Sequence, residues 1–164
     1  MIEIERKFLL KGLPDKKPTD IIKINQWYLK NDEGVWERIR SWDSNTNGKK
    51  WIHTIKTRIS DMSNIEEEKE VTEKEFLAFQ RKCHSKINQG RSIIKERRIY
   101  IDGENKWEID LFKSGCQLVI AEVEIPTEDY ELAIPEFIEK KNLMEVTGLK
   151  QFSNRSLANK VKTK

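Results

Sequence analysis

The sequence predicts an α+β fold: a closed, eight-stranded, mostly antiparallel β-barrel with helices packed on its outside. Two observations predict it. Turn signals that each end in glycine separate segments of alternating polarity, a pattern typical of β-hairpins. The 164 residues also include five Trp, six Phe and three Tyr, which supply enough large apolar side chains for a core. Eight antiparallel strands suffice to close a small barrel.

The strands follow from these turns, which we place at 31–34, 47–48, 102–103 and 114–115. Between and around them, alternation of apolar and polar residues predicts one strand in each segment. We expect the eight strands at residues 2–9, 22–30, 35–43, 49–59, 65–71, 92–101, 106–113 and 117–125.

A helix is predicted after the fifth strand, because Thr72 and Glu75 form a capping box. Its apolar face would contain Phe76, Phe79, Cys83 and Ile87. A second helix is expected near 133–141, where Pro135 suits the first turn. A third is expected over 153–161.

Composition excludes several classes of protein. Charged residues make up 36% of the chain but cancel to a formal net charge of +3, so no nucleic-acid partner is expected. No apolar run approaches the ~20 residues that span a bilayer, so no membrane partner is expected. The start of the chain does not resemble a signal peptide, and Cys83 and Cys116 lack metal-ligand spacing. We therefore expect a single cytoplasmic domain over 1–164, as a monomer or a homodimer.

Charged residues occupy alternate positions of most predicted strands, and each strand's set keeps one sign, except that Lys7 follows the first acidic pair. The basic sets are Arg38 and Arg40, Lys56 and Arg58, and Lys95 and Arg97. The acidic sets are Glu3 and Glu5, Glu66, Glu68 and Glu70, Glu108 and Asp110, and Glu122 and Glu124. Residues two apart share one face of a strand.

Two interpretations of this pattern remain open. A solvated face explains any single charged pair, since antiparallel sheets commonly expose one polar face. Sorting like charges strand by strand costs stability, however, unless acids and bases face each other in a closed barrel. A polyanion would match the basic strands of such an interior, and divalent cations would match the carboxylates. A metal-bound triphosphate satisfies both.

At these residues the sequence resembles the CYTH superfamily, the triphosphate tunnel metalloenzymes. The similar motifs, in order, are Glu3-x-Glu5-x-Lys7, Gln26-x-Tyr28-Leu29, Arg38-x-Arg40, Thr54-x-Lys56, Glu66-x-Glu68-x-Glu70, Lys95-x-Arg97, Trp107-Glu108-x-Asp110 and Ala121-Glu122-x-Glu124. They extend over residues 3–124, which makes the resemblance specific.

The C-terminal part resembles the bacterial triphosphatase group, where a terminal helix plugs one side of the tunnel. The similar residues are Glu145-Val146-Thr147, Phe152-Ser153-Asn154 and Leu157-Ala158. Two positions depart from that group: Leu149 stands where it usually has Asp, and Gln151 where it usually has Arg.

The resemblance implies roles for the charged residues. Phosphate binding would fall to Lys7, Arg38, Arg40, Lys56, Arg58, Lys95 and Arg97. Mg²⁺ or Mn²⁺ would be bound by Glu3, Glu5, Glu122 and Glu124, with Glu66, Glu68, Glu108 and Asp110 as candidates for a second metal. The candidate catalytic residues are Tyr28, Lys95, Glu68 and Glu70. Tyr28 would either pair with Lys95, as in bacterial relatives, or be an ordinary barrel tyrosine.

The function expected on this basis is metal-dependent hydrolysis of a triphosphate. Inorganic tripolyphosphate is the expected substrate, with ATP and thiamine triphosphate as further candidates. Three alternatives remain: a class IV adenylyl cyclase that makes cyclic AMP from ATP, a non-catalytic module that binds nucleotides or polyphosphate, and a salt-bridged surface sheet with no site. His53 and His84 are assigned structural roles.

Overall fold

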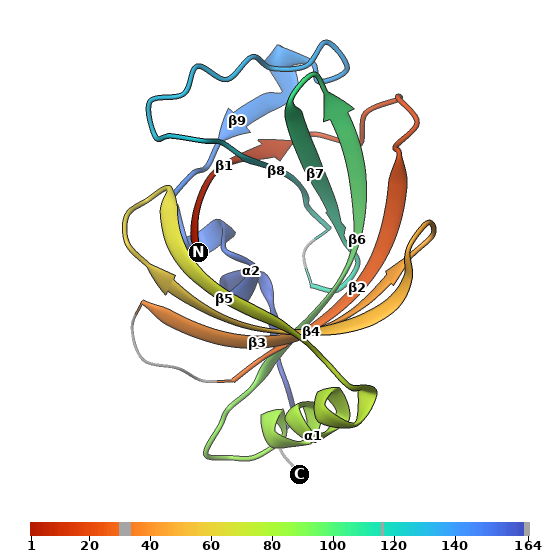
Figure 1. The fold of residues 1–164 in the computed structure, drawn as a ribbon, viewed down its shortest axis with the longest axis vertical. Helices are drawn as coiled ribbons and strands as arrows, with labels where there is room; N and C mark the ends of the chain where they lie inside the picture. Colours follow the sequence, from red (N-terminus) through yellow and green to blue (C-terminus); the bar gives the residue numbers. More distant parts are fainter. Residues whose placement is uncertain (30–33, 116, 163–164) are drawn as a thin grey trace.

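The computed structural model describes residues 1–29, 34–115 and 117–162, and it contains the expected closed barrel of eight strands (Figure 1). Residues 31–33 of the predicted turn at 31–34, and Cys116, lie outside these described residues. The barrel strands are β1 (Ile2–Leu10), β2 (Asp20–Tyr28), β3 (Val35–Ser44), β4 (Gly48–Arg58), β5 (Ser63–Val71), β6 (Arg91–Asp102), β7 (Asn105–Phe112) and β8 (Val119–Glu124). The remaining elements are α1 (Glu73–Cys83), α2 (Asn154–Leu157), β9 (Leu143–Glu145), β10 (Asn159–Lys160), and the 3₁₀ turns η1 (Lys140–Asn142) and η2 (Lys150–Phe152).

The barrel closes because its strands form an unbroken ring of neighbours. The strands follow the order β6-β2-β3-β4-β5-β1-β8-β7, and β7 pairs back with β6. Every pairing in the ring is antiparallel. Two short strands that the sequence did not predict extend it, since β9 pairs with β1 and β10 pairs with β6. Closure turns one face of every strand toward a shared interior.

The helix α1 packs against the outside of the barrel (Figure 1), and its predicted start is confirmed. The Thr72 side chain accepts from the backbone N–H of Glu75, and the Glu75 carboxylate reaches back to the Thr72 N–H. Phe76, Phe79 and Cys83 bury against Ile39 of β3. The prediction for Ile87 was wrong, because the helix ends at Cys83 and leaves this side chain 89% exposed.

The other two predicted helices differ from the structure. Residues 133–141 form no α-helix: a turn in which Ile138 N–H donates to Pro135 O is followed by extended backbone at Glu139 and then by η1. A short helix is marginal without tertiary support. The irregular path instead lets apolar side chains of the segment, including Phe137 and Ile138, cover the barrel wall.

The third predicted helix is shortened to α2, because the chain after it extends and pairs with a strand. Ser153 caps α2 as expected, and its side chain accepts from the Ser156 N–H. Ala158 is extended, and Asn159 and Lys160 pair with the start of β6.

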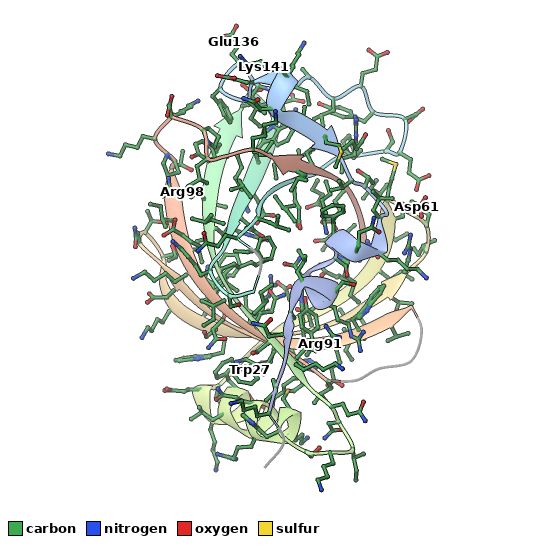
Figure 2. All side chains as sticks on the ribbon, turned by 180° about the vertical axis from the view of Figure 1, so that it is seen from behind. Trp27, Asp61, Arg91, Arg98, Glu136 and Lys141 are labelled. Atoms are coloured by element: carbon green, nitrogen blue, oxygen red, sulfur yellow. The ribbon has the colours of Figure 1, made fainter. Side chains whose placement is uncertain are left out.

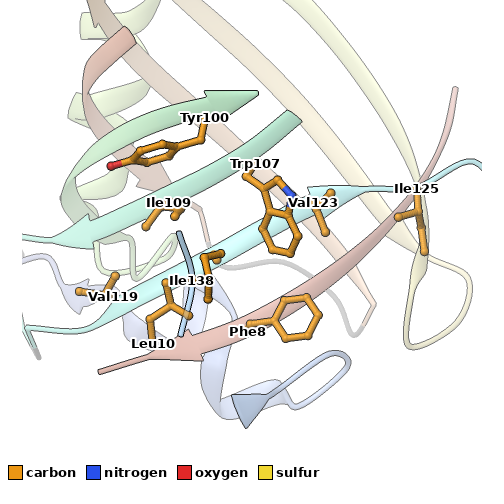
Figure 3. Close-up of a cluster of buried hydrophobic side chains, with 10 residues drawn as sticks. Phe8, Leu10, Tyr100, Trp107, Ile109, Val119, Val123, Ile125 and Ile138 are labelled. Carbon is orange, nitrogen blue, oxygen red and sulfur yellow. The ribbon is translucent and has the colours of Figure 1, made fainter. Parts of the chain in front are cut away.

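The largest core cluster lies outside the barrel wall, between β1, β6, β7, β8 and the 126–142 segment (Figure 3). Phe8, Trp107, Ile109 and Val123 are buried there, and Phe8 and Trp107 pack with their rings 5.8 Å apart. Ile2, at the start of β1, is instead 62% exposed. Among the residues that the structure describes, no helix is long and apolar enough to cross a membrane.

Candidate active site

A cavity of about 880 Å³ occupies the interior of the barrel, and charged side chains from most of its strands line it. Most of the predicted site residues lie on it: Glu3, Glu5, Lys7, Tyr28, Arg38, Arg40, Lys56, Arg58, Glu66, Glu68, Arg97, Glu108, Glu122 and Glu124. The strand periodicity therefore brings acids and bases together in one enclosed space.

The basic wall is formed by β3 and β4, and β5 supplies its carboxylate partners. In register, Lys56 lies opposite Glu66 across the β4–β5 pairing. Arg38 donates to Glu66 at 2.9 Å, and Arg40 donates to Glu68 at 2.7 Å. Burial and the neighbouring Arg38 lower the pKa of Arg40 to about 10, so it stays charged at neutral pH. These pairs compensate buried charge and hold the guanidinium groups at the cavity wall.

A buried ionic cluster lies on β6 and β7, formed by Lys95, Arg97 and Asp110. Lys95 Nζ donates to Asp110 Oδ2 at 2.7 Å, and Arg97 Nε donates to Asp110 Oδ1 at 2.7 Å. Burial lowers the pKa of Lys95 to about 8, although Asp110 opposes that shift. Lys95 and Asp110 are not among the residues that line the cavity, and Asp110 accepts from Arg97, which does line it.

The acidic wall places like charges directly opposite each other. Glu5 faces Glu124 across the β1–β8 pairing, and Glu108 faces Glu122 across the β7–β8 pairing. Directly opposed like charges destabilise a sheet unless a counter-ion neutralises them. Burial and the neighbouring Glu66 raise the pKa of Glu3 to about 8. Burial and the neighbouring Glu108 likewise raise the pKa of Glu124.

This acidic wall fits a hard divalent cation, which carboxylate oxygens bind well. Glu3 and Glu5 share a single cation, Lys56, at 3.6 and 3.4 Å, and Glu124 makes no ion pair within the described part of the chain. These three carboxylates are the candidates to hold a metal, because Glu122 lies between two cations, Lys7 at 3.4 Å and Arg97 at 3.9 Å. The lysine and arginine neighbours lower the pKa of Glu122 against the effect of its burial. Within the described ranges, no three acidic, His or Cys side chains already converge on one point.

Tyr28 lines the cavity near Arg38. Its hydroxyl does not bond to Lys95, which was one of the two roles expected for it. Gln26 Nε2 donates to the Tyr28 hydroxyl. Burial opposes the charge of Arg38, but Tyr28 and Glu66 outweigh it and raise the pKa of Arg38. The Lys95 ammonium instead donates to Asp110 and to Asn154 Oδ1.

Glu70 is the predicted catalytic residue that lies apart from the others. It shares the face of Glu66 and Glu68 but pairs with Ile52, further along β5. It is exposed and is not among the cavity residues.

Some residues that line the cavity were not predicted from the sequence; they come from the C-terminal segment and from two tryptophans of β3. The C-terminal segment 146–156 crosses one end of the barrel (Figures 1 and 2) and contributes Lys150 and Arg155, among others. On β3, Trp36 and Trp42 flank the two arginines on the same inward face. The alternation along β3 could have identified these tryptophans. The C-terminal residues could not be found by alternation, because tertiary contacts place them.

Solved structures with similar folds include proteins of described activity. The inorganic triphosphatase NE1496 is 25% identical, with a TM-score of 0.61 over 98% of this chain and 96% of that one. A putative adenylyl cyclase from Hippeastrum, described as having dominant triphosphatase activity, is 18% identical, with a TM-score of 0.55 over 76% and 80%. The PH1819 protein from Pyrococcus horikoshii is 15% identical, with a TM-score of 0.57 over 77% and 80%.

No family model matches this sequence, and no curated protein is significantly similar to it. The closed barrel of eight antiparallel strands, with charged side chains lining its interior, nevertheless defines the class of protein: a β-barrel whose interior forms a charged tunnel. The fold of these structural neighbours agrees with the resemblance to the CYTH superfamily, near the bacterial triphosphatases, that the sequence motifs indicate.

Proposed function

We propose that this protein hydrolyses a triphosphate inside the barrel, that the reaction depends on Mg²⁺ or Mn²⁺, and that inorganic tripolyphosphate is the substrate. The observation that carries the proposal is the facing of a basic wall and an acidic wall across one cavity. A polyanion alone would leave the opposed carboxylates uncompensated, whereas a metal-bound polyanion compensates both walls. The structural similarity to an inorganic triphosphatase supports the same reading.

The position of each side chain in the cavity indicates whether it would bind the phosphate groups or the metal. Lys7, Arg38, Arg40, Lys56, Arg58 and Arg97 would bind the phosphate oxygens, the arginines with two-pronged contacts. Glu3, Glu5 and Glu124 would hold the divalent cation. When bound, that cation would neutralise phosphoryl oxygens and acidify a nearby water. Phosphoryl transfer needs positioning and charge neutralisation above all, and this cavity is built to supply both.

Glu68 is the best candidate to orient the attacking water. Its carboxylate lines the cavity and is 43% exposed, so one oxygen is accessible while Oε2 accepts from Arg40. Tyr28 would contact the substrate beside Arg38. Lys95 would act as a positioning residue, because its ammonium is buried between Asp110 and Asn154.

An assay of products tests the proposal against its alternatives. The protein is incubated with tripolyphosphate, ATP or thiamine triphosphate, with Mg²⁺, Mn²⁺ or EDTA. Release of phosphate from tripolyphosphate only when metal is present is the expected result. Pyrophosphate with cyclic AMP from ATP would indicate a cyclase, and binding without any product would indicate a binding module.

Glu5→Gln tests the metal site. Replacing the carboxylate by an amide removes a charged ligand, so we expect metal-dependent turnover to fall by about 100-fold or more. Glu67→Gln is the matched control, because Glu67 is an exposed residue of the neighbouring strand β5 that does not line the cavity. Initial rates are measured as a function of metal concentration. Full activity in Glu5→Gln would remove Glu5 from the metal site.

A further inference from the structure

The C-terminal segment brings into the cavity a cation that the barrel strands do not supply. Arg155 lies on α2 and lines the cavity. Seen from behind the barrel, the segment that carries α2 lies in front of the opening (Figure 2). Arg155 is therefore placed at the end of the cavity that this segment covers.

The backbone around Arg155 is fastened to the barrel wall at several points. Lys95 Nζ donates to Asn154 Oδ1 at 2.9 Å. Arg91 Nη1 donates to the carbonyl oxygens of Ala158 at 2.9 Å and of Arg155 at 3.4 Å. Beyond α2, β10 pairs with β6. These bonds fix where the Arg155 side chain starts, which pre-organises its guanidinium for binding.

The charge of Arg155 is left uncompensated, in contrast to the cations proposed to bind phosphate on the barrel wall. Those cations have carboxylate partners, as in the pairs Lys7–Glu122, Arg38–Glu66, Arg40–Glu68 and Arg97–Asp110. Arg155 makes no ion pair within the described part of the chain, and its Nε is buried there without a hydrogen-bond partner. A buried donor without a partner is costly, and an anion in the cavity would satisfy it.

We propose that Arg155 is a substrate-binding residue, which binds a free terminal phosphoryl group at the covered end of the cavity. This inference rests on the proposed function. A phosphate that meets Arg155 displaces no carboxylate, whereas one that meets Arg38 or Arg40 competes with Glu66 or Glu68. Arg155 therefore contributes binding energy that Arg38 and Arg40 cannot contribute without losing an ion pair, and it favours polyphosphates whose terminal group carries no ester.

Binding measured without turnover tests this assignment. Tripolyphosphate is titrated into the full-length protein by calorimetry, in EDTA and at 0.15 M salt so that distant charges are screened. The variants are Arg155→Gln, Arg155→Lys and the control Lys160→Gln, which removes an exposed cation of β10 outside the cavity. We expect Arg155→Gln to weaken binding by about 10-fold or more, the scale of one charge-assisted contact. Arg155→Lys should restore part of the affinity, and Lys160→Gln should leave it within about twofold.

The outcomes separate the inference from the proposed function. Unchanged affinity in Arg155→Gln overturns the role of Arg155, whether or not tripolyphosphate is hydrolysed. Tight binding by the natural protein without hydrolysis overturns the proposed function, while a loss of affinity in Arg155→Gln still supports the phosphate contact. Absence of binding by the natural protein overturns both. If Arg155→Gln lowers the melting temperature, Arg155→Met, which keeps the aliphatic stem, is titrated instead.

Discussion

Asp110 shares the inward face of its strand with Glu108, yet only Glu108 lines the cavity, whereas Asp110 is buried. Asp110 is fully buried and accepts from Lys95 and from two nitrogens of Arg97. Burial alone would raise its pKa, but Arg97 and Lys95 outweigh burial and hold the pKa below the ordinary value. A carboxylate already committed to two cations is a poor metal ligand. Its role is to fix Arg97 at the cavity wall.

Asp110→Asn tests this structural role. The amide leaves Lys95 and Arg97 as buried cations without a full counter-charge, so we expect the free energy of unfolding to fall by about 3–5 kcal/mol. Urea denaturation measures the change. Glu108→Gln is the control, because Glu108 is 26% exposed and pairs with Arg97 at the cavity surface, where removal of the charge should cost less. Unchanged stability with loss of metal activation in Asp110→Asn would instead make Asp110 a metal ligand.

The connection from α1 to β6 depends on a close approach of two backbones. The helix ends at Cys83, and the chain returns through Gln89, whose φ is 40°, to Gly90. The Gly90 N–H donates to Cys83 O at 3.0 Å, and the Val161 N–H donates to Gly90 O at 2.8 Å. A single glycine therefore joins the helix, the barrel and the C-terminal strand.

Gly90→Ala is expected to loosen this junction. An added Cβ would lie 2.5 Å from both the Cβ and the carbonyl oxygen of Cys83, so backbone must shift. We expect a loss of about 1–3 kcal/mol in the free energy of unfolding, the usual cost of forced overpacking. Gly12→Ala is the matched control, since nothing lies within 4 Å of its added Cβ. Equal stability of the two variants in denaturant titrations would contradict the close approach.

For the whole molecule, the barrel could be predicted well because the alternation of residues along each strand shows which face is buried and which is charged. Alternation and glycine turns are local, so the eight strands and the inward face of residues such as Arg38 and Glu66 follow from them. The position of a residue along the barrel axis, however, cannot be predicted from its neighbours in the sequence. Glu70 has the right face but lies too near the end of its strand, and Asp110 has the right face but is buried by its bonds to Lys95 and Arg97. Those outcomes depend on register and on the layers around each residue.

The segments after β8 were the hardest to predict because tertiary contacts determine their form. Residues 133–141 contain helix-compatible spacing, but their apolar side chains gain more by covering the barrel wall irregularly. The residues after Leu157 extend because the start of β6 offers an edge for pairing. Neither the wall nor that edge is visible in the segment's own sequence.

The integrity of the whole assembly can be followed through Cys83, which is fully buried between α1 and the barrel. Its thiol donates to the Tyr28 carbonyl oxygen of β2 at 3.5 Å. Burial raises the pKa of the thiol from 9.0 to about 12. The folded protein holds this proton more tightly than the unfolded chain, so the stabilisation is complete below pH 9 and is lost as the pH rises toward 12.

Two measurements in a Cys116→Ser background follow from this burial. At pH 8, we expect a thiol reagent to label Cys83 at least ~100-fold more slowly in the native protein than in denaturant, because labelling requires opening of the structure. Between pH 9 and 11, the natural thiol should lose stability relative to Cys83→Ala, whose side chain cannot ionise. Fast labelling under native conditions, while the barrel remains folded by circular dichroism, would show that α1 detaches on its own. The helix would then be a separate unit of stability, and only the barrel strands would unfold as one.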